Sequence, residues 1–114
     1  MNYALLAYSR EDRSDEPGTR AMHPAIAAVL ERPDVTGWVR LHPAESATTV
    51  ALQARNTLLI DGPFVESKEF LGGLIFVEAD NLDGAVAVAA ELQDLDLTAA
   101  IEVRPVFELE LGGA

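Results

Sequence analysis

With 114 residues the chain is long enough for a single domain with its own core, and we expect one domain over residues 1–114. Apolar residues make up 49% of the sequence, which excludes a disordered chain. The formal net charge of −11 argues against binding to nucleic acid or to anionic membranes, because both need a basic surface.

The chain has no cysteine, so disulfides, thiolate catalysis and thiolate metal sites are excluded. No apolar run approaches the roughly 18–20 residues that a membrane-spanning helix needs. The N-terminus lacks the basic start and cleavage site of a signal peptide. We therefore expect a cytoplasmic protein.

The first half of the chain predicts a strand, a short helix and three further strands. The run 3–8 is apolar and short, as in a buried strand, and the charged segment from Arg10 to Gly18 reads as an exposed loop. Apolar residues at helical spacing then predict a helix that ends at Pro33. Strands are expected over 34–41, 46–54 and 57–60, with Arg55-Asn56 as a tight turn between the last two.

The second half predicts a strand, a helix and a strand. Residues 74–77 are wholly apolar, and Asp80-Asn81 offers a cap for a helix with one apolar face. The alternation over 101–111 predicts a last strand, with Pro105 at an edge or a bulge.

This order indicates an α+β protein with a ferredoxin-like βαββαβ fold and an extra hairpin strand. In that fold the strands 3–8 and 74–77 lie side by side in the centre of an antiparallel sheet. Both are apolar on both faces, whereas the helices cover only one face. A second copy of the same sheet is the simplest cover for the other face, so we expect a homodimer.

The segment from Ile60 to Gly73 is the main site candidate. It combines an Asp-Gly-Pro turn, an aromatic residue, alternating charges and a glycine pair in one connection between two expected strands. Gly62 and Pro63 are expected to be structural, since glycine permits an unusual φ and proline fixes the next one.

The motif resembles the signature of the DGPF branch of the YCII-related family. The resemblance is carried by Asp61-Gly62-Pro63-Phe64, by Glu66 and Lys68-Glu69, and by Leu71-Gly72-Gly73. Further segments fall in the same order as in that branch and extend the match over nearly the whole chain: Tyr3-Ala4-Leu5-Leu6-Ala7-Tyr8, Ala47-Thr48-Thr49-Val50, Asp80-Asn81-Leu82-Asp83 and Val103-Arg104-Pro105-Val106.

The resemblance implies a dimeric α+β barrel of ferredoxin-like protomers and says little about chemistry. Some branches of the family are thought to be enzymes with a His–Asp pair, and DGPF members often occur beside extracytoplasmic-function sigma factors. The strand after the first helix departs from the usual Gly-Gly-Glu pattern. It reads Gly37-Trp38-Val39, so the carboxylate of that pattern is missing here.

Two residues are candidates for acid–base catalysis. Asp61 is a potential general base, although its position in an Asp-Gly-Pro turn equally suits a hydrogen bond to the turn backbone. His23 titrates near neutrality and precedes Pro24 at a helix start, where it is either a proton donor and acceptor or simply a helix-end residue.

Five further residues are candidates for ligand binding: Tyr8, Phe64, Glu66, Lys68 and Arg104. Four of them also have a structural reading. Phe64 suits a core position, Glu66 and Lys68 suit a solvated ion pair, and Arg104 suits a pair with Glu102 or Glu108.

We expect no metal site, since two histidines without carboxylates at ligand spacing do not make one, and no phosphate-binding loop. The leading hypothesis is a cofactor-free small-molecule enzyme or ligand-binding protein that uses acid–base residues near the Asp61–Phe64 motif. The alternative is a non-catalytic interaction or regulatory module associated with a sigma factor. A purely structural dimer is the third reading.

Overall fold

The computed structural model describes residues 1–10, 22–65, 68–95 and 100–111. The charged segment expected to form a loop after the first strand falls mostly outside these residues. The elements follow in the order β1 (Asn2–Ser9), α1 (Pro24–Leu30), β2 (Val35–Arg40), the 3₁₀ turn η1 (Ala44–Ser46), β3 (Thr48–Gln53), β4 (Asn56–Asp61), β5 (Phe70–Glu78), α2 (Leu82–Leu95) and β6 (Ala100–Pro105).

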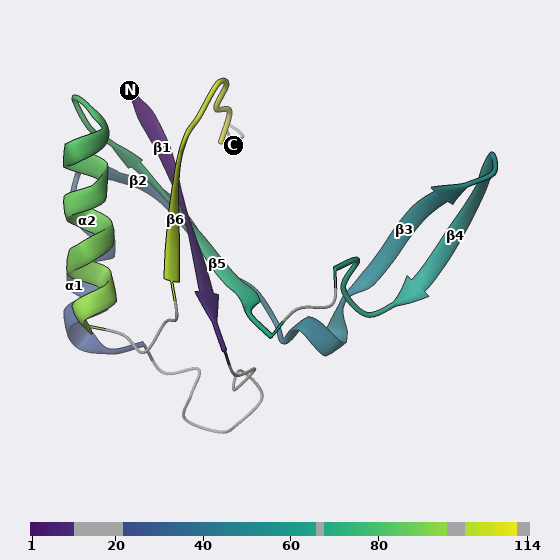
Figure 1. Cartoon of the computed structure of the whole chain (residues 1–114). Coiled ribbons are helices and arrows are strands. Elements are labelled where there is room, and N and C mark those ends of the chain that lie inside the picture. Colours follow the sequence, from purple (N-terminus) through teal and green to yellow (C-terminus); the bar gives the residue numbers. More distant parts are fainter. Residues whose placement is uncertain (11–21, 66–67, 96–99, 112–114) are drawn as a thin grey trace.

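Four of the strands form one antiparallel sheet in the order β2-β5-β1-β6. Both helices pack on the same face of this sheet, while β3 and β4 pair with each other and project away from it (Figure 1). Without that hairpin, the connectivity and strand order are compatible with the predicted ferredoxin-like fold. The hairpin contributes both of the strands expected over 46–54 and 57–60, so the fold has two strands beyond the ferredoxin-like four and not the one extra strand that we counted.

The core lies between the sheet and α2. Tyr3 and Leu5 on β1 and Val77 on β5 are buried there, since Tyr3 pairs with Val77 and their side chains share the face under the helices. From α2, four residues close this core: Ala85, Val88, Ala89 and Leu92. Apolar residues of β1 and β5 thus alternate into the helix layer, as predicted.

The other face of the sheet has no helix. On β1 it carries Ala4 and Leu6, which pair with Phe76 and Leu74 on β5. Val39 of β2 lies opposite Leu74 and is 45% exposed, while the other four are half-buried. We call these five residues the open face. They confirm the prediction that the two central strands are apolar on both sides.

Three predicted boundaries were wrong. β5 begins at Phe70, four residues before the expected start at 74, so the glycine pair lies within the strand and not in the connection before it. The hairpin turn is Ala54-Arg55, with φ of +49° and +69°, one residue earlier than expected. The last strand ends at Pro105 instead of continuing to residue 111, because proline has no N–H for the ladder. The segment beyond it turns back toward β2, and a Cβ on Gly37 would lie 3.4 Å from a Leu111 methyl group.

The glycine pair of the Leu-Gly-Gly motif gives a stability prediction. A Cβ on Gly73 would lie 2.7 Å from the Val39 carbonyl oxygen, whereas one on Gly72 meets nothing nearer than the Ala7 oxygen at 3.9 Å. Gly73→Ala is expected to lower the free energy of unfolding by about 1–3 kcal/mol through this backbone clash. Gly72→Ala is the matched control and is expected to change it by less than about 0.5 kcal/mol. Equal denaturation curves for the two variants would contradict the close β2–β5 approach.

Candidate functional site

The Asp61–Phe64 motif begins where the hairpin ends. Gly62 has a φ of +106°, as its expected structural role required, and its N–H donates to the Ala47 carbonyl oxygen at 2.7 Å. The hydroxyl of Thr49 donates to the Gly62 carbonyl oxygen, also at 2.7 Å. The start of the motif is therefore held by the chain that enters β3.

Most of the predicted loop residues are exposed to solvent. Asp61 is the last residue of β4 and is exposed, and Phe64 is 76% exposed, so the reading of Phe64 as a core residue was wrong. Lys68 is exposed just before β5. Glu66 lies outside the described residues.

Tyr8 and the end of the loop lie at the same end of the sheet. Tyr8 pairs with Leu71 and Ser9 with Phe70, so β5 begins beside the last residues of β1. Lys68 precedes Phe70 by two residues and thus approaches this end. Tyr8 is half-buried and follows Ala4 and Leu6 in the alternation of β1, which directs it to the open-face side.

His23 caps α1, whose first turn lies toward the same end of the sheet (Figure 1). Its Nδ1 accepts a hydrogen bond from the Ala25 N–H at 3.1 Å, and Pro24 occupies the first helical position as expected. Since Nδ1 is an acceptor, the neutral ring carries its proton on Nε2. The helix-end reading of His23 therefore holds, and its exposed Nε2–H is still available as a donor.

Arg104 lies elsewhere on the sheet. On β6 it lies opposite Ala4 of β1, and it forms an ion pair with Glu102, one of the two partners considered from the sequence. Ala4 and Tyr8 are four residues apart, or roughly 13 Å along the strand. The sequence grouped Arg104 with the loop residues, but the sheet register separates them.

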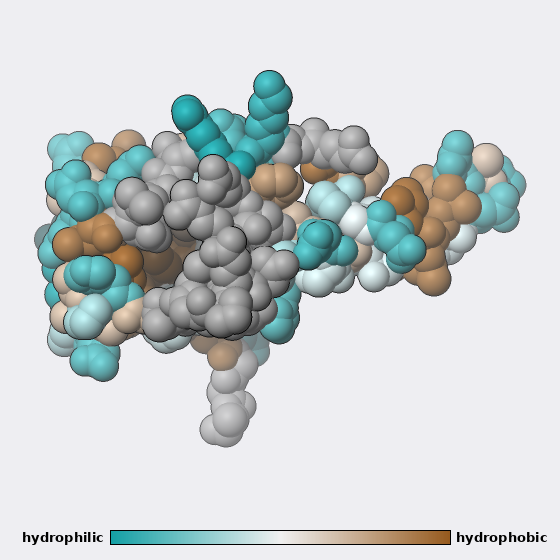
Figure 2. All heavy atoms as spheres, turned by 90° about the horizontal axis from the view of Figure 1, so that it is seen from below, coloured by the Kyte–Doolittle hydropathy of each residue, from teal (hydrophilic) through white to brown (hydrophobic). Residues whose placement is uncertain are grey.

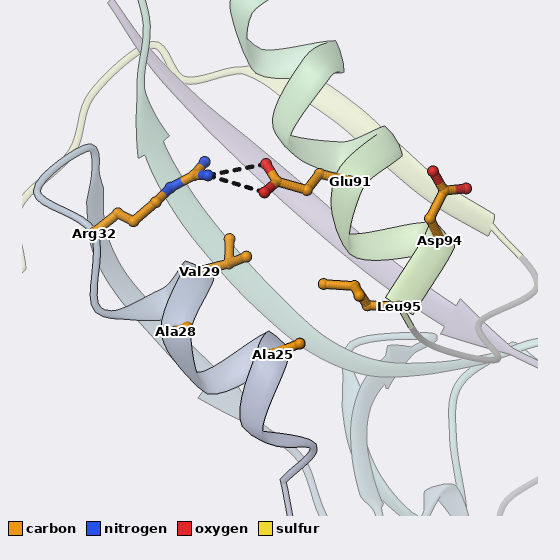
Figure 3. Close-up of a pocket in the computed structure, with 7 residues that line it drawn as sticks. All are labelled: Ala25, Ala28, Val29, Arg32, Glu91, Asp94 and Leu95. Carbon is orange, nitrogen blue, oxygen red and sulfur yellow. Dashed lines mark hydrogen bonds and ion pairs between the residues drawn. The ribbon is translucent and has the colours of Figure 1, made fainter.

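A shallow groove of about 460 Å³ lies between α1 and α2 and contains none of the predicted site residues (Figure 3). Small side chains such as Ala25 and Ala28 leave it open, and Arg32 closes one end by donating two hydrogen bonds to Glu91, at 2.9 and 3.1 Å. That hydrogen bonding raises the pKa of Arg32 above its ordinary value, so the guanidinium remains charged. The groove is better explained as a helix–helix contact than as a site.

Two further properties bear on the class of site. Across the part of the chain that the structure describes, no three histidine or carboxylate side chains gather as metal ligands would. None of the described helices has the length and apolar character to cross a membrane.

These features define a small α+β domain with a ferredoxin-like strand order, an apolar sheet face that no helix covers and an exposed loop at one end of it. The chain belongs to the YCII-related family, whose domain model matches residues 1–110. It is also 32% identical to an uncharacterised protein of Rhizobium meliloti (strain 1021), over 93% of this chain and 92% of that protein.

The contact between Thr49 and Gly62 leads to a test of how the loop is held. Thr49→Val keeps the shape of the side chain but removes the hydrogen bond to the Gly62 carbonyl, a loss of about 1 kcal/mol. We expect the Gly62 amide to exchange with solvent roughly fivefold faster in this variant, measured by NMR. Thr48→Val, one residue earlier and exposed, is the control and should leave that rate unchanged. An unchanged rate in Thr49→Val would contradict the proposed anchoring.

Proposed function

We propose that this protein is a cytoplasmic, single-domain homodimer of the DGPF branch that binds a small molecule and acts on it without a cofactor. Two copies would pair through their open faces to give the dimeric α+β barrel. The ligand would bind at the end of the sheet formed by Tyr8 and the start of β5, which follows Lys68.

The observation that carries the proposal is the position of polar groups beside an apolar surface. Tyr8 lies at the end of β1 on the open-face side, and Lys68 precedes the start of β5, which pairs with that end of β1. A ligand pocket of this kind needs apolar walls and a few polar groups that fix orientation. When a second sheet covers the open face, this end becomes the mouth of an enclosed apolar space.

The residues near this mouth suit acid–base chemistry. The Lys68 ammonium would hold an anionic group of the ligand, and the Tyr8 hydroxyl would donate a proton or a hydrogen bond. His23 caps a helix on the other face of the sheet, so its Nε2–H would reach only a ligand that extends around the end of the sheet. Asp61, at the end of the hairpin, would be the base. Such a set fits isomerisation or elimination next to a carboxylate or carbonyl group.

A thermal-shift screen against small organic anions and neutral metabolites tests this proposal. For a compound that stabilises the unaltered protein, Lys68→Ala and Tyr8→Phe are each expected to cost about 2 kcal/mol of binding free energy, or roughly thirtyfold in affinity. Arg32→Ala also removes one positive charge, but on the helix layer, and should leave the ligand-induced shift unchanged.

Asp61→Asn separates binding from catalysis, because it keeps the shape of the side chain and removes the base. We expect it to retain most of the ligand-induced shift. If Lys68→Ala and Tyr8→Phe leave every shift unchanged, the proposal is wrong, and the alternative of a non-catalytic module that binds a protein such as a sigma factor is favoured.

A further inference from the structure

The hairpin β3–β4, residues 48–61, is exposed to an unusual degree, and we call it the arm. All six residues of β4 are exposed, and Leu52 and Leu59 are 77% and 74% exposed. Figure 2 shows apolar side chains gathered on the arm, away from the body of the domain. A two-stranded hairpin on its own is at best marginally stable in water.

Both sides of the arm carry apolar residues. Val50 pairs with Leu59 on one side, next to Leu52, and Ala51 pairs with Leu58 on the other, next to Ile60. Among these, Val50 is 67% exposed. An arm that only connected β2 to β5 would not need apolar side chains on both faces, so we conclude that it is buried against something.

The dimensions of the chain indicate how much surface is left to bury. The chain exposes 8178 Å², whereas a compact monomer of its mass, 12.2 kDa, exposes roughly 6,100 Å². Its radius of gyration is 15.6 Å, against about 13 Å for a compact domain of this length. Both values exceed those of a compact domain, as a projecting arm requires.

The direction of the arm identifies where its partner would stand. In Figure 1 the arm extends away from α1 and α2, which lie on the other side of the sheet. That is the side of the open face. A second copy seated on the open face would therefore lie beside the arm, and two-fold symmetry would place its own arm beside the first copy.

Charge also favours a second copy as the occupant. Between Thr49 and Ile60 the only charged residue is Arg55, at the turn of the arm, while the rest of the chain carries a net charge of −12. A basic tip on a long apolar arm complements the acidic body of another copy. The base of the arm is fixed by the Gly62–Ala47 and Thr49–Gly62 hydrogen bonds, which lowers the entropy lost on docking.

We propose that the arm of each protomer docks on the body of the other, so that two copies clasp each other reciprocally. This inference rests on the homodimer of the proposed function, but it is independent of the ligand. It assigns the apolar residues of β3 and β4 to an intersubunit contact.

Site-specific cross-linking tests where the arm docks. The chain has no cysteine, so Gln53→Cys introduces a single thiol near the tip of the arm, to which a benzophenone maleimide can be attached. Irradiation is expected to join two chains and to leave the linked peptide on the body of the partner. Gln93→Cys on α2 is the control and should give no cross-linked dimer above background. If Gln53→Cys links only to its own chain, or no more than the control, the proposal is overturned.

A matched pair of charge substitutions tests the contribution of the arm to association. Leu59→Glu is expected to weaken dimerisation by about tenfold or more in sedimentation equilibrium, with an unchanged circular dichroism spectrum because the residue is exposed within one chain. Val86→Glu makes the same kind of change at a 45% exposed position of α2 and should leave dimerisation unchanged.

The outcomes separate this inference from the proposed function. If Leu59→Glu still forms a dimer and the probe at residue 53 gives no cross-link, the arm contact is wrong, but the open-face dimer is not contradicted. If Leu59→Glu weakens the dimer but Lys68→Ala and Tyr8→Phe leave every ligand-induced thermal shift unchanged, the arm contact is supported and the proposed function is wrong.

Discussion

The central constraint on this molecule is that β1 and β5 are apolar on both faces while its helices cover only one. Tyr3, Leu5 and Val77 meet α2 and form the core. Leu6, Leu74 and Phe76 point the other way, from the same two strands. Burial of apolar surface contributes roughly 25 cal/mol per Å² to stability, so a face left in water does not contribute. This matters most for a small domain, because it buries a smaller fraction of its surface. The proposed dimer, the ligand site at its mouth and the arm contact all follow from this.

Much of the fold could be predicted because it depends on local patterns. The apolar runs of β1 and β5 are central in the sheet, and α2 begins after the predicted cap, since the Gly84 N–H donates to the Asn81 side chain. Pro24 begins α1. Strand order then followed from the sequence of elements, which allows few arrangements with short, right-handed connections.

The details that failed depend on context that a local pattern does not contain. Asn56 was expected in the turn because asparagine tolerates positive φ, but the strand register places Ala54 and Arg55 there despite their cost of about 1–2 kcal/mol each. Alternation in β3 indicated a half-buried strand, and the strand is largely exposed within one chain. The same pattern would be satisfied by a neighbouring molecule, which one sequence does not reveal.

The candidate site could be predicted only in part, for the same reason. The family motif singled out Asp61 and Lys68, and the sheet register places the start of β5, two residues after Lys68, beside the end of β1. The register also separates Arg104 from Tyr8 by four positions along β1, which no spacing in the sequence indicated. Strand pairing decides which residues of different strands lie close together. A site built from several strands can therefore be predicted only where the register of those strands can be predicted.

The most direct test of this account is the mass of the unaltered protein in solution, measured by light scattering after gel filtration over a dilution series. The account predicts a particle of twice the 12.2 kDa of one chain, maintained into the low micromolar range. A particle of 12.2 kDa at every concentration, with the chain folded, would contradict it, because the open face would then be stable in water without a partner.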